Sequence, residues 1–123
     1  MKITKKLLLK FENDIADLYE EKKIKGPIHL SGNNEDKLIR IFKKVKKNDW
    51  VFSSWRNHYH AILKGVPEDY VKKEVIKGKS MILNSIENRF FSSSIVGGIL
   101  PIALGVALAL KKKNKKSIVW VFV

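Results

Sequence analysis

The stretch that decides the fold is FFSSSIVGGILPIALGVALALKKKNKKSIVWVFV, residues 90–123. Its serine- and glycine-rich beginning predicts a loop over residues 92–98, in which the backbone can approach a neighbouring group closely. The sequence then carries no charge as far as Leu110, which predicts a helix that is buried on every side, with Pro101 at its first position. Five lysines within residues 111–116 follow, where the helix dipole favours positive charge.

The final stretch predicts a buried strand over residues 117–123, because residues 118–123 are all apolar and do not alternate with polar ones. Such a strand is typical of a parallel sheet, and parallel sheets bind ligands beyond the carboxyl ends of their strands. We therefore predict an α/β fold with three layers around a parallel sheet. We also expect this sheet to be incomplete at its C-terminal side.

The upstream sequence predicts the helices that would cover such a sheet. Leu8, Phe11, Ile15 and Leu18 recur at helical spacing, which predicts an N-terminal helix over residues 5–23. The other expected elements are a helix at 35–47, a buried strand at 50–52, helices that end at Gly65 and near Lys77, and an irregular loop over 78–91. With 123 residues, the whole chain is expected to form one partial domain, 1–123.

Composition excludes several classes of protein. The absence of cysteine excludes a disulfide framework and a thiolate metal site. A net charge of +13 would suit a nucleic-acid-binding protein. However, the lysines form no stripe with aromatic residues and belong to no recognition motif, so we interpret them as a solvated surface and predict no nucleic-acid partner.

Membrane insertion is not expected either. The apolar part of the predicted C-terminal helix, residues 95–110, has 16 residues, fewer than the roughly 20 that cross a bilayer. The lysines behind it do resemble the flank of a membrane segment. The first residues, MKITKKLLLKFEND, lack the apolar core of a secretory signal. We therefore expect a cytoplasmic protein.

Two groups of residues could carry chemistry. His58 and His60 are two positions apart, which does not place both on one helix face, and no carboxylate pattern completes a ligand set, so no metal site is predicted. Trp55 and Arg56 stand with His58 just after the predicted strand. An arginine can grip a phosphate there, while the histidine titrates near neutrality. Arg56 could equally pair with a carboxylate, and spacing alone leaves both readings open.

Several segments, in order, resemble one known family. They are LYEEKKIKGPIHLS (18–31), NDWVFSSWRNHYHAILKGV (48–66), SIVGGILPIALGVALALK (94–111) and SIVWVFV (117–123). Together they are similar to the N-terminal part of the alpha subunit of thiamine-diphosphate-dependent 2-oxo acid dehydrogenases, of the pyruvate, branched-chain and acetoin types. The resemblance covers nearly the whole chain and implies a thiamine-diphosphate-binding fold.

The resemblance also implies an activity and the residues that serve it. In the family, a 2-oxo acid is oxidatively decarboxylated and its acyl group passes to a lipoyl carrier, while a beta subunit supplies the activating glutamate. The implied site residues are Trp55 and Arg56 at the cofactor diphosphate, His29 and His58 at the active-site entrance, Ser94 and Val96 at the aminopyrimidine, and Gly97 in the adjoining loop.

The chain departs from the family in ways that leave its role open. It ends before the family's Gly-Asp-Gly motif, so the magnesium ligands are absent and no metal-binding residue is predicted. Ser94 replaces a glycine, Tyr59 another glycine and Ile82 a histidine. We expect a truncated product, half of a split enzyme that needs a second C-terminal chain, or a fragment. The alternatives are a non-catalytic remnant that binds a partner chain and a basic membrane-associated or nucleic-acid-binding protein.

Overall fold

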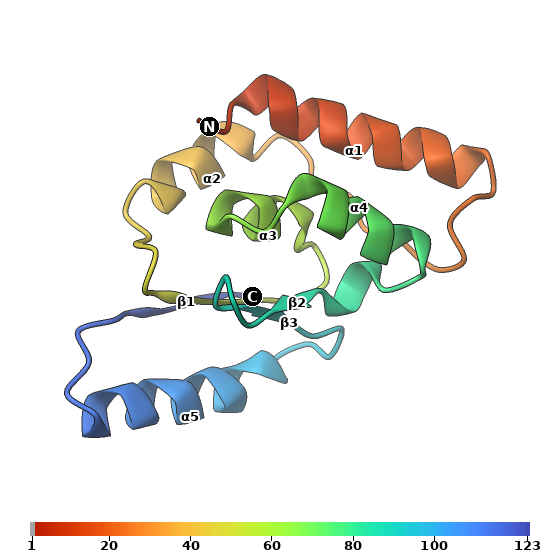
Figure 1. Cartoon of the computed structure of the whole chain (residues 1–123). Helices are drawn as coiled ribbons and strands as arrows, with labels where there is room; N and C mark the ends of the chain where they lie inside the picture. The colour runs from red at the N-terminus through yellow and green to blue at the C-terminus, as the bar shows by residue number, and fades with distance from the viewer. Residues whose placement is uncertain (1) are drawn as a thin grey trace.

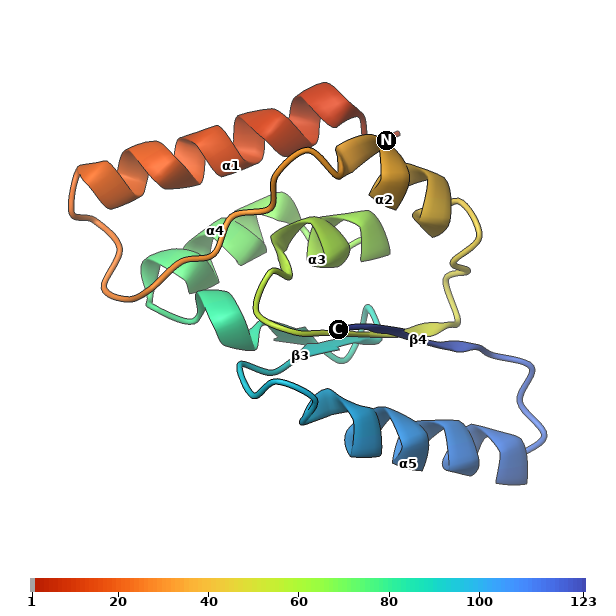
Figure 2. The same cartoon turned by 180° about the vertical axis from the view of Figure 1, so that it is seen from behind.

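The computed structural model describes residues 2–123 and places helices on both faces of a four-stranded sheet (Figures 1 and 2). In chain order the elements are α1 (Lys5–Glu20), α2 (Glu35–Phe42), β1 (Trp50–Ser53), α3 (His58–Lys64), α4 (Glu68–Ile76), the short 3-10 turn η1 (Ser80–Ile82), β2 (Asn84–Ser85), β3 (Phe90–Ser92), α5 (Ile99–Lys112) and β4 (Val119–Phe122).

The sheet confirms the predicted α/β class. Its strand order is β2-β3-β1-β4, and the central strand β1 pairs in parallel with both β3 and β4. Val51 of β1 stands opposite Phe90 on one side and Trp120 on the other. Only the two-residue strand β2 runs antiparallel among the described strands. The carboxyl ends of β1, β3 and β4 therefore meet at one edge of the sheet.

Helices α1 to α4 cover one face of the sheet, and α5 lies alone on the other (Figure 1). The larger core lies under the first four helices, where Leu8, Phe11 and Ile15 of α1 are completely buried. The apolar spacing that predicts this helix also explains its packing, because residues three and four apart lie on one helix face. The smaller core joins α5 to the sheet through Ile99 and Phe52.

The turn after α4 packs closely against the segment that follows α1, and Gly78 makes this contact possible. Gly78 has a φ of +83°, and a Cβ at this position would lie 3.1 Å from the backbone oxygen of Lys25. A side chain would therefore be strained and would also press against the segment after α1. Glycine allows the turn after α4 to pack directly against that segment.

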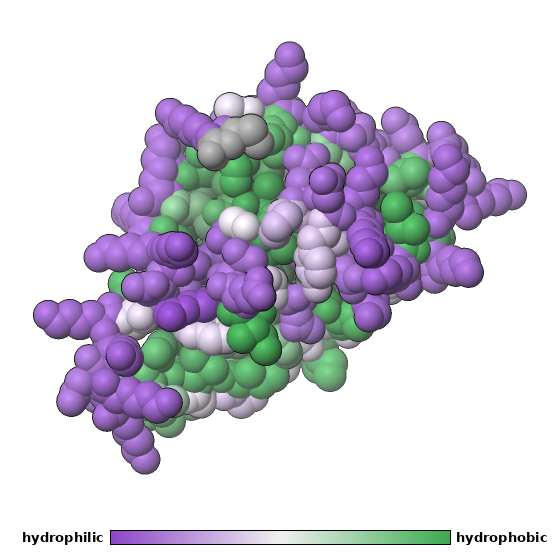
Figure 3. Space-filling model, in the orientation of Figure 1, coloured by the Kyte–Doolittle hydropathy of each residue, from purple (hydrophilic) through white to green (hydrophobic). Residues whose placement is uncertain are grey.

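The structure corrects the prediction that the C-terminal helix is buried on every side. Only Ile99 and Ala103 of α5 are buried, whereas Leu100, Leu104 and Leu108 are 48%, 61% and 52% exposed. Figure 3 shows the resulting apolar surface over α5. The reason is that α5 contacts the sheet with one face, and no described element of residues 2–123 covers the opposite face. Likewise, β4 is only half-buried.

Several boundaries also differ from the prediction. The first helix ends at Glu20 instead of residue 23, because Lys22 adopts a positive φ of 57°. The C-terminal helix begins at Ile99, so Pro101 is its third residue. The segment 78–91, expected to be irregular, contains η1, β2 and the start of β3. Within residues 2–123, no helix combines the length and apolar character that crossing a membrane requires.

Candidate functional site

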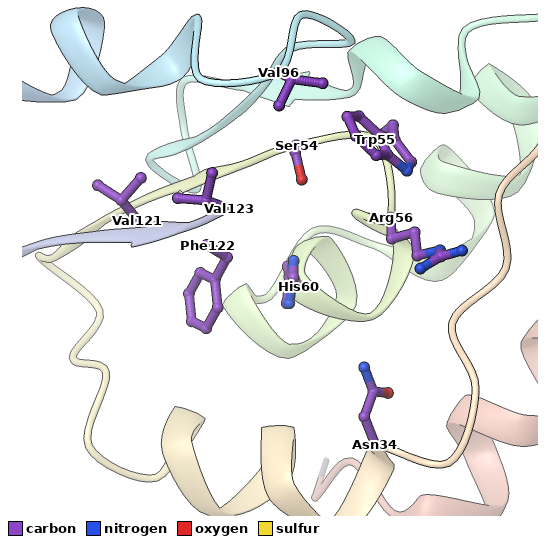
Figure 4. Close-up of a pocket in the computed structure, with 9 residues that line it drawn as sticks. All are labelled: Asn34, Ser54, Trp55, Arg56, His60, Val96, Val121, Phe122 and Val123. Atoms are coloured by element: carbon purple, nitrogen blue, oxygen red, sulfur yellow. The ribbon is translucent and has the colours of Figure 1, made fainter.

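A pocket of about 470 Å³ opens at the carboxyl ends of β1 and β4 (Figure 4). We call it the strand-end pocket. Its lining comes from four separate segments of the chain and consists of Asn34, Ser54, Trp55, Arg56, His60, Val96, Val121, Phe122 and Val123. It lies at the edge of the sheet where a parallel fold is expected to bind its ligand.

Local structure explains how these side chains meet. Strand β1 ends at Ser53, and residues 54–56 then cross the end of the sheet before Asn57 begins α3. The end of β4 contributes the apolar wall, and Val96 reaches the pocket from the loop before α5 (Figure 4). On the opposite side, Asn34 stands at the beginning of α2. Its side-chain oxygen Oδ1 is buried and has no hydrogen-bond partner.

Arg56 makes no ion pair with a carboxylate among the described residues. Its side chain is exposed at the pocket, and no carboxylate of residues 2–123 lies within salt-bridge distance of its guanidinium. Arg56 is thus not a strand-end arginine that neutralises an acidic side chain. An arginine without an internal partner can bind an anionic group of a ligand with two parallel hydrogen bonds.

The other predicted site residues are only partly brought together. The ring of His29 lies beside that of Trp55, with 6.1 Å between their centroids. Ser94 is exposed in the same loop as Val96, and Gly97 there has a φ of +73°. In contrast, His58 is completely buried in the helical layer, where its Nε2 shares a 2.8 Å hydrogen bond with Ser80. His58 therefore faces away from the strand-end pocket.

His60 lines the pocket, although from the sequence we considered it only as a metal ligand and assigned it no role. Its Nδ1 shares a 2.6 Å hydrogen bond with the hydroxyl of Ser53. Its ring stacks on Phe122 and Phe42, with centroid distances of 4.3 and 6.0 Å. Burial among these groups lowers the pKa of His60 from 6.5 to about 4. His60 is therefore neutral at pH 7, so one of its ring nitrogens donates a hydrogen bond and the other accepts one.

The pKa of His60 predicts an acid-sensitive fold. Because its pKa in the folded chain lies below 6.5, the unfolded chain binds a proton that the folded chain excludes between pH 6.5 and about 4. The free energy of unfolding is expected to decrease as the pH falls through this window. His60→Phe should lose this part of the decrease, whereas His29→Gln should keep it. Urea unfolding across this pH range measures the effect, and an unchanged pH profile in His60→Phe would contradict the assignment.

A parallel sheet with helices on both faces and a pocket beyond the carboxyl ends of its strands defines an open α/β protein with a ligand site at its usual place. The model of the dehydrogenase E1 component family matches residues 4–123, so the chain belongs to this family.

Relatives narrow the comparison to one subunit. The chain is 35% identical to the pyruvate dehydrogenase E1 component subunit alpha of Rickettsia prowazekii, over 94% of this chain and 39% of that protein. It is 30% identical to the subunit alpha of Porphyra purpurea, over 79% and 31%, and to the chloroplastic subunit alpha-3 of Oryza sativa subsp. japonica, over 85% and 27%. These matches confirm the predicted resemblance to an alpha subunit.

The chain spans less than two fifths of the length of these three relatives. One of them carries a chloroplastic name, so a cytoplasmic location for this chain stays a prediction. Within residues 2–123, no group of three or more histidine or acidic side chains is placed to hold a metal ion.

Proposed function

We propose that the chain serves as the alpha side of a thiamine-diphosphate site in a dehydrogenase that acts on a 2-oxo acid. One observation carries this proposal. Trp55 and Arg56, which follow β1, line the same pocket as Val96, which precedes α5. The family resemblance implies cofactor contacts for these three residues, although 40 positions separate Arg56 from Val96.

The residues of the strand-end pocket fit the proposed cofactor. Arg56 has no internal partner and would hold the diphosphate, with Trp55 beside it. Val96 and Val121 supply apolar walls that would exclude water from a flat ring. The unpartnered oxygen of Asn34 would accept a hydrogen bond from a ligand N–H group. When bound, thiamine diphosphate supplies the carbanion chemistry of decarboxylation.

The remaining predicted residues take part in the proposal to different degrees. His29 is the histidine that lies next to Trp55, and it would hold or release a proton near the entrance. Ser94 and Gly97 belong to the loop that would offer backbone groups to the aminopyrimidine. The catalytic role of His58 stays a prediction that this geometry does not support, because its ring contacts Ser80 instead of the pocket.

The proposed partners are a beta subunit, a C-terminal half chain and a lipoyl carrier. The exposed leucines of α5 support a partner chain, because Leu100, Leu104 and Leu108 are spaced by four residues and form one apolar stripe. The alternative function, a non-catalytic chain that binds a partner, has the same support. Cofactor binding separates these two functions.

Co-expression with the beta subunit of the same organism and with the proposed C-terminal half chain tests both functions. We expect the chain to co-purify and the assembly to bind thiamine diphosphate with magnesium in a calorimetric titration. Leu104→Asp should prevent co-purification, because it places a charge in the apolar stripe, whereas Leu9→Asp on α1 should not. Co-purification without cofactor binding would favour the non-catalytic chain, and loss of neither partner nor cofactor in Leu104→Asp would contradict the proposed interface.

A further inference from the structure

A cluster of buried polar side chains lies in the helical layer, outside the strand-end pocket. It brings together α1, α2, α3 and η1 through Glu12, Glu35, His58, Tyr59 and Ser80, none of which is more than 5% exposed. Buried polar groups of this kind require partners, since each unpaired group costs free energy. Of these residues, only His58 has a predicted role in the proposed function. The position of His58 outside the strand-end pocket does not support that catalytic role.

One member of the cluster reaches a segment that borders the pocket. The Glu12 oxygen Oε1 accepts a 2.9 Å hydrogen bond from the backbone N–H of Ser31. Ser31 ends the segment 28–31, which we call the histidine loop because it carries His29. The ring of His29 in turn lies 6.1 Å from that of Trp55, which lines the strand-end pocket. Glu12 is thus linked to the pocket through the histidine loop.

This hydrogen bond is unusual in its surroundings. Among residues 2–123, the whole connection 24–33 makes no other backbone or side-chain hydrogen bond. Otherwise the connection is held by apolar packing, since Ile28 and Leu30 contact the main core. Apolar contacts are not directional, so they leave the orientation of the backbone free. The contact with Glu12 is the one directional restraint on this part of the chain.

The surroundings of Glu12 hold its carboxyl group in place. His58 Nδ1 lies 3.7 Å from the same oxygen that binds Ser31. His58 is itself fixed by its hydrogen bond to Ser80 and by an edge-on contact with the ring of Phe11, whose centroid is 6.0 Å away. A buried side chain with restrained neighbours is a rigid acceptor, as a positioning group requires.

We propose that Glu12 is a positioning residue that anchors the histidine loop through the N–H of Ser31 and thereby keeps His29 beside Trp55. The role assigned to His29 at a cofactor site rests on the proposed function. The anchoring of the loop does not, and it can be tested on the chain alone. His58 lies next to Glu12 without lining the pocket, and its Nδ1 makes no hydrogen bond within residues 2–123.

Amide hydrogen exchange of the 123-residue chain tests the anchor. Glu12→Leu replaces the carboxylate with an apolar side chain of similar size and so removes the acceptor, and the Ser31 amide should then exchange about tenfold faster. Glu12→Asp retains a carboxyl group that is one methylene shorter and should also release the loop. Glu12→Gln keeps an acceptor oxygen at the same reach and should restore the parent rate.

The control is Ser92→Ala, which removes buried hydrogen bonds with the Asn57 side chain and the Leu83 carbonyl but leaves Glu12 and its neighbours unchanged. It should leave the Ser31 amide as protected as in the parent. A uniform acceleration of exchange across α3 and β1 in Glu12→Asp would mean general destabilisation and would overturn the proposal. Equal Ser31 rates in the parent and Glu12→Asp would overturn it as well.

A separate titration relates the anchor to the site. In the assembly with the beta subunit, thiamine diphosphate should bind to Glu12→Gln as it binds to the parent, and severalfold more weakly to Glu12→Asp. If the parent assembly binds no cofactor, the proposed function fails while the exchange result still decides the anchor. If cofactor affinity is equal in the parent and in a Glu12→Asp chain whose loop is released, the link from the anchor to the site is wrong.

Discussion

Replacing Arg56 by alanine is expected to weaken the binding of thiamine diphosphate by roughly ten- to a hundredfold, which corresponds to about 1.5–3 kcal/mol. The reason is that Arg56 lines the strand-end pocket without any carboxylate partner in the described chain. A charge-assisted contact with a diphosphate would therefore replace water, not an internal ion pair. The measurement is a calorimetric titration of the assembled protein with cofactor and magnesium.

Two further variants make this test specific. Arg56→Lys keeps the charge but cannot hold two phosphate oxygens at once, so it should bind the cofactor more weakly than the parent. Arg40→Ala removes an exposed arginine of α2 that lies outside the pocket and should change nothing. The assignment of Arg56 to the diphosphate would be wrong if the parent binds the cofactor and both Arg56 variants bind it as tightly as the parent does.

Replacing Asp49 by alanine is expected to lower the free energy of unfolding by about 3 kcal/mol. Asp49 is only 1% exposed and joins the beginnings of β1 and β4. Its oxygens accept hydrogen bonds from the backbone N–H groups of Ile118 and Lys46, each at 2.9 Å, and from the indole N–H of Trp120 at 3.0 Å. Removing the carboxyl group leaves these donors without an acceptor.

Controls and pH separate this effect from a general loss of charge. Asp36→Ala removes a mostly exposed carboxylate that pairs with Lys5 and should cost far less. Urea unfolding measures both variants, and equal losses would contradict the role given to Asp49.

Burial acts to raise the pKa of Asp49, but the hydrogen bonds from Ile118, Lys46 and Trp120 outweigh it and hold the pKa below 3.8. Because the pKa of Asp49 is lowered, its stabilising effect is lost at a lower pH than the stability that depends on His60. A depressed pKa means that Asp49 contributes its full stabilisation above pH 3.8 and loses it as the pH falls further. His60 acts between pH 6.5 and about 4. Acidification should therefore weaken the fold in two successive steps, the first of which is absent in His60→Phe and the second in Asp49→Ala.

The sheet was predictable where its strands are apolar on both faces. Residues 50–52 and 118–123 were identified in this way, because continuous apolar runs are typical of buried parallel strands. The third parallel strand, β3, was missed because Phe90 and Phe91 are followed at once by three serines. A strand of three residues is too short to show a period, and its pairing with β1 depends on a residue 39 positions away, Val51.

The site was predictable only where the resemblance provided a motif. Trp55, Arg56 and Val96, which the resemblance assigns to a cofactor, line the strand-end pocket, and their contacts with a cofactor stay proposals. His60 could not be found, because its role depends on stacking against Phe122, which lies 62 positions further along the chain. The i, i+2 argument did separate the two histidines correctly, since His58 faces the helical layer and His60 faces the pocket.

The parallel topology has a consequence for the order in which the chain folds. Strand β1 pairs with strands that lie far along the chain, and the Asp49–Ile118 hydrogen bond closes a loop of 69 residues. The contacts between successive helices, such as α2 with α3 and α3 with α4, are closer in sequence, so the entropy lost in forming them is smaller. We infer that the helical layer assembles on β1 first and that β4 docks last. The wall of the strand-end pocket is then completed only at the end of folding, and no ligand can be held there earlier.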